Sequence, residues 1–232
     1  MAEMVQQALP AAGSPAGNPR KMVAVLSGVA ALSGLLIVGV FQFTLPFIDA
    51  NREAMIERAI FTVVPGGASK QVYGYTGNGI EPNPAAAAFG DRFYAVYDES
   101  GALKGVALET SAQGYQDVIR ILYGYDPDRQ IVTGITVLES KETPGLGDKI
   151  GKDPAFLANF EALDAAADPA TNLLHNTIVA VKSGQKEDPW EIDGIAGATI
   201  SSVAIANMLD LGLRRDLPRL RPHIDELRKA PA

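Results

Sequence analysis

The chain has 232 residues, no cysteine, two histidines and a formal net charge of −7 at pH 7, and 47% of its residues are hydrophobic. The lack of thiols excludes disulfides, thiol catalysis and cysteine-ligated iron–sulfur clusters, and two histidines do not favour a metal centre. The acidic balance argues against nucleic acid as a partner, because phosphate binding needs a basic face.

The N-terminal part predicts a membrane anchor behind a short tail. Residues 1–21 have no hydrophobic periodicity and predict a disordered cytoplasmic tail. Residues 22–48 carry no charge, and about twenty apolar residues suffice to span a bilayer even if Pro46 ends the helix early. A cleaved signal peptide would have a shorter apolar region. The preceding Arg20 and Lys21 favour a cytoplasmic N-terminus, with everything after the span outside the cytoplasm.

The anchor also carries small residues spaced four apart. These pairs are Ala24/Gly28, Ser27/Ala31 and Ala30/Gly34. Such spacing lets helices approach closely in lipid and indicates membrane partners, although alanine and glycine are common in any spanning helix. Both interpretations stay open.

Residues 49–215 predict one acidic domain, followed by a charged, proline-broken tail at 216–232 that we expect to pack loosely. An amphipathic helix is expected from residue 51 to about residue 61, and residues 64–67 (VPGG) should stop it. Residues 74–88 are rich in glycine, asparagine, proline and alanine, so a long loop is expected there.

Two antiparallel hairpins are expected next. One pairs residues 92–98 with 103–109, and the other pairs 118–125 with 131–138 around the turn at Pro127. A helix should run from 154 to about 166 with Asp153 as its cap, and a short strand is expected at 177–181. The fold class is therefore α+β: a single N-terminal transmembrane helix and one domain of antiparallel strands with flanking helices.

A second candidate helix follows a small, flexible stretch, residues 193–202 (DGIAGATISS). One helical face places Ile205, Met208, Leu209 and Gly212 together. Ser201 or Ser202 is expected to cap this helix. The first-turn N–H groups and the helix dipole make such a corner an anion site, and Gly197 and Ala198 let backbone approach a ligand. By itself, however, the string is typical of an ordinary helix cap.

The second motif is the loop at residues 141–150 (KETPGLGDKI). Pro144 and Gly145 alone indicate an ordinary type II turn between a strand and a helix. Glu142 and Thr143 add a hydrogen-bond acceptor and a donor, while Gly145 and Gly147 permit backbone contact with a ligand.

These two motifs, in this order behind a single anchor, resemble the G subunit of the Rnf ion-translocating electron-transport complex. The chain is more distantly similar to the C subunit of the sodium-translocating NADH:quinone oxidoreductase, which remains an alternative. The resemblance extends from the anchor to about residue 215. It implies a flavoprotein domain on the periplasmic side of the bacterial inner membrane that relays electrons and contributes no catalytic residue or metal site of its own.

The resemblance also implies the cofactor, FMN, joined through its phosphate to the hydroxyl of Thr199 by a dedicated flavin transferase. Asp193 would belong to the transferase recognition motif. The remaining cofactor-binding residues implied are Gly197, Ala198, Ser201, Ser202, Glu142, Thr143, Gly145 and Leu146. Tyr123 or Trp190 could flank the flavin, but an aromatic side chain in a domain of this size more often belongs to the core.

One departure from the family pattern is Ala196, where the family usually has serine or threonine. Any hydrogen bond from that hydroxyl to the cofactor or transferase is missing, and we expect attachment to be retained because Thr199 and Asp193 are present. The implied partners are the membrane, iron–sulfur and flavin subunits of the complex, which couples ferredoxin and NAD chemistry to ion transport. The alternative of another class is a membrane-anchored scaffold in which Thr199 only starts a helix.

Overall fold

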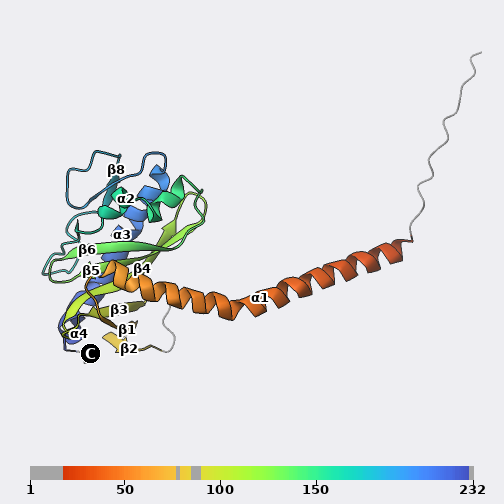
Figure 1. The fold of residues 1–232 in the computed structure, drawn as a ribbon, viewed down its shortest axis with the longest axis horizontal. Coiled ribbons are helices and arrows are strands. Elements are labelled where there is room, and N and C mark those ends of the chain that lie inside the picture. The colour runs from red at the N-terminus through yellow and green to blue at the C-terminus, as the bar shows by residue number, and fades with distance from the viewer. Residues whose placement is uncertain (1–17, 77–78, 85–89, 230–232) are drawn as a thin grey trace, which may run out of the picture. The chain divides into compact units, whose positions relative to one another are not determined.

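The computed structural model describes residues 18–76, 79–84 and 90–229. The chain divides into two units, Met1–Asn51 and Arg52–Ala232. The second unit consists of an antiparallel sheet, a long C-terminal helix and several short elements (Figure 1). This confirms the predicted α+β class.

The first helix, α1 (Pro19–Val63), runs without interruption through Pro46. The predicted anchor and the predicted amphipathic helix are therefore one element. Among the described residues α1 is the one helix long and apolar enough to cross a membrane, judged by length and composition. The predicted disordered tail is wrong at residues 19–21, which form the start of α1, and residues 1–17 lie outside the described residues.

The main sheet contains seven antiparallel strands in the order β2-β1-β3-β4-β5-β6-β7. They are β1 (Ser69–Thr76), β2 (Gly79–Pro82), β3 (Arg92–Tyr97), β4 (Leu103–Gln113), β5 (Val118–Asp126), β6 (Ile131–Glu139) and β7 (Leu163–Asp164). Both predicted hairpins are confirmed. The expected loop at 74–88 is wrong at residues 74–76 and 79–82, which form a hairpin pair with each other; residues 77–78 and 85–88 lie outside the described part.

The region after β6 differs most from expectation. A 3-10 helix, η1 (Gly147–Gly151), begins within the 141–150 loop, and α2 (Pro154–Ala158) is much shorter than the predicted helix. Asp153 caps α2 as predicted, accepting hydrogen bonds from two backbone N–H groups. The chain then turns into β7 and pairs with β6, so Phe160 and Leu163 are buried by a turn and a strand instead of a helical stripe. Residues 179–181 form β8 (Val179–Val181), which pairs in parallel with β9 (Glu191–Asp193).

The long helix α3 (Thr199–Leu220) covers one face of the sheet. Its predicted apolar face is confirmed, with Ile205, Met208 and Leu209 fully buried. The expectation of a loose tail after residue 215 is wrong. Helix α3 continues through Pro218, and η2 (Arg221–His223) and α4 (Ile224–Leu227) follow it. Leu217, Leu220 and Leu227 are buried in the same core as the sheet.

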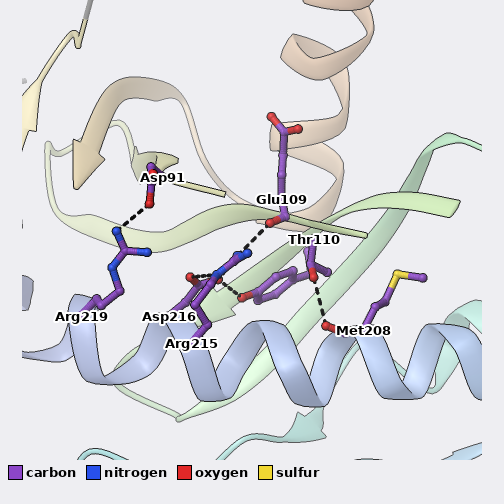
Figure 2. Close-up of polar contacts among 8 residues, drawn as sticks. Asp91, Glu109, Thr110, Met208, Arg215, Asp216 and Arg219 are labelled. Atoms are coloured by element: carbon purple, nitrogen blue, oxygen red, sulfur yellow. Dashed lines mark hydrogen bonds and ion pairs between the residues drawn. The ribbon is translucent and has the colours of Figure 1, made fainter. Parts of the chain in front are cut away.

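Polar groups also hold α3 against the sheet (Figure 2). Asp216 is 1% exposed and receives hydrogen bonds from the neighbouring Arg215 guanidinium and, at 2.8 Å, from the Tyr123 hydroxyl of β5. The Thr110 hydroxyl of β4 donates to the Met208 carbonyl at 3.1 Å, and Arg219 pairs with Asp91 at 2.6 Å. The buried charge is thus compensated by direct partners, as a buried carboxylate requires.

The last turns of α1 lie against the opposite face of the sheet. Gly124 and Gly134 stand opposite each other on β5 and β6, and we call this pair the glycine notch. A Cβ atom on Gly124 would overlap the Val63 carbonyl oxygen, and one on Gly134 would lie 3.3 Å from the Val63 Cα. The Thr133 hydroxyl donates to that same carbonyl at 2.5 Å. The glycine notch therefore lets the backbone at the end of α1 pack directly against the sheet.

Candidate functional site

The two sequence motifs meet at the N-terminal end of α3. They line one cavity of about 380 Å³, within the range of about 300–1,000 Å³ usual for small-molecule sites. The residues lining it are Tyr115, Glu142, Thr143, Leu146, Gly147, Gly197, Ala198, Thr199, Ile200 and Ser201. Residues more than fifty positions apart in the sequence thus form one concave surface.

Thr199 is the first residue of α3, and its side chain is exposed. The turn before it contains Gly197 at a φ of +85°, a conformation that favours glycine. Within the described chain, the backbone N–H groups of Thr199, Ile200 and Ser201 have no protein acceptor, as is usual in the first turn of a helix. An exposed hydroxyl therefore stands beside open donors suited to an anion.

The two serines do not cap α3. Ala198 occupies the capping position and makes no side-chain hydrogen bond, so the prediction of a serine cap is wrong. Ser202 is buried inside the first turn, where its hydroxyl donates to the Ala198 carbonyl and accepts from the Ile195 N–H. This pair of bonds fixes the turn that leads into the helix, because it joins both of its ends.

Glu142 ties the loop to the helix. Its side chain is buried, and it accepts a hydrogen bond from the Ser201 hydroxyl at 2.5 Å and from the Gln116 N–H at 3.0 Å. The Gln116 side-chain amide in turn donates to the Thr143 hydroxyl at 2.8 Å. The Glu142 side chain therefore joins three segments that are distant in the sequence. These hydrogen bonds also supply the partners that a buried carboxyl group requires.

Three predicted site residues lie outside this cavity. Gly145 has a φ of +77°, as its turn requires, and donates to Asp148. Ser202 lines a neighbouring cavity of about 400 Å³, which Thr199 also borders. Asp193 borders a third cavity of about 280 Å³, and its carboxylate accepts from the Gly184 N–H at 2.6 Å.

Neither of the two aromatic residues considered from the sequence lines the cavity. Tyr123 is fully buried beneath α3 and bonded to Asp216, and Trp190 is not among the residues that line the cavity. Tyr115, which sequence reasoning missed, lines it instead. The only signal in the sequence was its place beside Gly114 in a turn between two strands.

Comparison with known proteins shows the family to which the chain belongs. Residues 114–214 match the FMN-binding domain family, a span that begins at the Tyr115 turn and ends within α3. Over 190 residues the chain is 30% identical to the G subunit of the ion-translocating oxidoreductase complex of Haemophilus influenzae, covering 79% of this chain and 83% of that protein. The chain belongs to this family of G subunits.

Two further likenesses agree with that assignment. The G subunit of the ion-translocating oxidoreductase complex of Methanosarcina acetivorans is 34% identical over 117 residues, which are 50% of this chain and 54% of that protein. The crystal structure of Shewanella oneidensis NqrC superposes with a TM-score of 0.56 at 17% identity, covering 78% of this chain and all of that one. At that identity the likeness to NqrC bears on the fold alone, and it agrees with the mixed helix and antiparallel sheet described above.

Proposed function

We propose that this chain is the electron-relay subunit of a membrane-bound ion-translocating oxidoreductase and carries FMN joined through its phosphate to the Thr199 hydroxyl. The observation that carries the proposal is the shared cavity: Thr199 stands on its rim, and both motif loops form its walls. A cofactor fixed by a covalent bond serves as a stationary relay, and its potential is set by the surrounding protein.

The residues present fit such a group. Leu146 and Ile200 offer apolar surface for a flat ring system, and Glu142, Thr143 and Ser201 place polar groups beside it. When bound, FMN would supply one- and two-electron redox chemistry. The protein's part is to hold the ring away from bulk water and to offer the free N–H groups of the α3 first turn to a phosphoester.

The attachment is tested with the full chain produced together with a flavin transferase. Thr199→Val keeps the size and branching of the side chain but removes the oxygen, so no phosphoester can form. Thr199→Ser keeps the oxygen and should retain attachment. We expect the native chain and Thr199→Ser to gain the mass of FMN minus water, on the peptide that contains residue 199, and to fluoresce as bands on a denaturing gel.

The same mass measurement can contradict the proposed attachment. Added mass that survives in Thr199→Val, or that maps to Ser201 or Ser202, would place the attachment elsewhere. A native band with no added mass and no fluorescence would instead favour the scaffold interpretation. Ser202→Ala is the matched control, because it alters the same turn without touching Thr199 and should keep the flavin.

Membrane association follows from helix α1 and from the family, and we propose that the sheet domain lies on the periplasmic side, which would also expose it to the transferase. The basic pair Arg20–Lys21 before the apolar run supports this orientation. A C-terminal alkaline phosphatase fusion should be active and a C-terminal green fluorescent protein fusion dark. The reverse result would reject both the orientation and the proposed route of flavin attachment.

The proposed partners are the other membrane, iron–sulfur and flavin subunits of the complex. A Cβ atom placed on Gly28 or Gly34 would have nothing within 4 Å, so α1 offers an open small-residue surface to neighbouring helices. Because the chain has no cysteine to ligate a cluster, we assign the proposed iron–sulfur chemistry to those partners.

A further inference from the structure

Tyr115 is an exposed aromatic residue at the mouth of the candidate cavity. It lies in the turn between β4 and β5, is 64% exposed, and lines the same cavity as Thr199. Within the described part of the chain its ring and hydroxyl make no hydrogen bond, ring contact or ion pair. No contact among the described residues accounts for its position.

The turn that carries Tyr115 is held in place. The Gly114 N–H donates to the Asp117 carbonyl at 2.9 Å, and Asp117 pairs with Lys141 at 2.6 Å. On the other side, Gln116 is bonded to both Glu142 and Thr143. A Cβ atom on Gly114 would lie 2.6 Å from a Glu142 carboxylate oxygen, so the turn approaches the 141–150 loop as closely as glycine allows.

Tyr115 is also one of three large exposed side chains around this cavity. Leu146 is 51% exposed and Ile200 is 55% exposed, and the three residues come from separate segments of the chain. Apolar surface gathered around a concavity, supported by rigid backbone, is typical of a site for a flat apolar ligand. A ring system placed there would cover all three side chains.

We infer that the Tyr115 ring forms one wall of the flavin site and stacks on the isoalloxazine, acting as a positioning residue. This inference rests on the proposed function and names a contact within that same site. Aromatic faces attract flat conjugated rings in offset-stacked geometry, and such contacts tolerate exposure to solvent at their outer side. The ring would shield the flavin face from water and hold it against Leu146 and Ile200.

The test uses the full chain in detergent, loaded with FMN by a transferase and checked for added mass on residue 199. A tyrosine in contact with a flavin quenches its fluorescence and blocks collisional quenchers such as iodide. Tyr115→Leu should raise the flavin fluorescence yield several-fold and increase its quenching by iodide. In Tyr115→Trp the flavin fluorescence should stay as weak as in the native chain. In Tyr115→Phe the flavin fluorescence should increase, but the flavin should remain shielded from iodide.

Trp190→Phe is the matched control, because Trp190 does not line the cavity and its loss should leave both signals unchanged. If loaded Tyr115→Leu is as dark and as shielded as the native chain, the stacking inference is wrong while the proposed function stands. A change produced by Trp190→Phe alone would likewise assign the contact to Trp190 and overturn it.

A second measurement separates the two proposals. The native chain and Tyr115→Leu, both made without transferase, are titrated with free FMN, and its fluorescence is followed. Quenching that depends on Tyr115 supports the wall even if no mass is ever found on Thr199. If Tyr115→Leu changes the fluorescence of neither attached nor free FMN, the inference that Tyr115 stacks on the flavin is wrong. The added mass on residue 199 then tests the proposed function independently.

Discussion

At the scale of single residues, Glu142 has the largest expected effect on the site. Glu142→Ala would leave the Gln116 N–H and the Ser201 hydroxyl without their acceptor, at a cost of about 1–3 kcal/mol for the buried Ser201 hydroxyl and less for the solvent-exposed Gln116. Glu142→Gln keeps one amide oxygen as an acceptor and should lose less. Thermal unfolding of the chain made without flavin, together with amide hydrogen exchange at residue 116, measures both effects.

The conservative variant also serves as the control for this prediction. Equal midpoints and equal exchange protection in native chain and Glu142→Ala would show that the carboxylate does not hold the turn and the helix together. Loss in Glu142→Ala with near-native behaviour in Glu142→Gln is the expected order.

The sequence predicted that Thr199, Glu142, Thr143 and Leu146 belong to the site, and all four line the cavity. This was possible because residue types and the order of the two motifs can be read from the sequence alone. It could not identify Tyr115, since an aromatic residue in a turn has no periodic pattern and its value depends on what lies across the cavity. It also misjudged the serines. Their hydroxyls were expected to cap the helix, but Ser201 is taken by Glu142, 59 residues away.

At the scale of elements, the glycine notch determines how the end of α1 meets the sheet. Gly124→Ala would force a methyl group onto the Val63 carbonyl, and we expect a loss of about 1–3 kcal/mol from overpacking. Gly134→Ala, its cross-strand partner, meets only a 3.3 Å contact and should lose clearly less. Thermal unfolding in detergent compares the two, and hydrogen exchange at residues 60–64 locates the damage.

Equal losses in the two variants would mean that alanine weakens the strands generally and that the notch has no special fit to α1. From the sequence, a glycine in a strand suggests a bulge or a close backbone approach, but it does not say which segment approaches. The contact of Gly124 with the end of α1 could therefore not be predicted. The length of α2 could not be predicted either, because it also depends on contacts between distant segments. Asp153–Pro154 marks a helix start correctly, but the helix ends after five residues because the chain turns into β7 and pairs with β6.

At the scale of the whole molecule, buried tyrosines determine the response to alkali. Burial is the largest cause that raises the pKa of Tyr75, Tyr94, Tyr97, Tyr123 and Tyr125. The unfolded chain releases these protons near pH 10, whereas the folded chain keeps them to higher pH. Because the unfolded state then binds fewer protons, stability is intact below about pH 10 and falls as pH rises above it.

An absorbance titration near 295 nm, run beside far-ultraviolet circular dichroism, measures this effect. We expect the tyrosinate absorbance of these five residues to appear in step with unfolding. Gradual ionisation of these five tyrosines while the fold persists would contradict it. Composition predicted the acidic charge and the anchor, but the burial of these rings depends on the folded sheet, with Tyr94 on the face that meets the end of α1 and the other four on the face that meets α3.

The joining of distant segments through Glu142 has a consequence for when the cofactor is acquired. The cavity needs the turn at 114–117, the loop at 141–147 and the first turn of α3 to be assembled together, and α3 itself runs to Leu220. A chain in which α3 is incomplete therefore presents the Thr199 hydroxyl with no pocket behind it. We expect the flavin attachment proposed for Thr199 to follow completion of the tertiary fold, so that a chain truncated within α3 should gain no FMN mass.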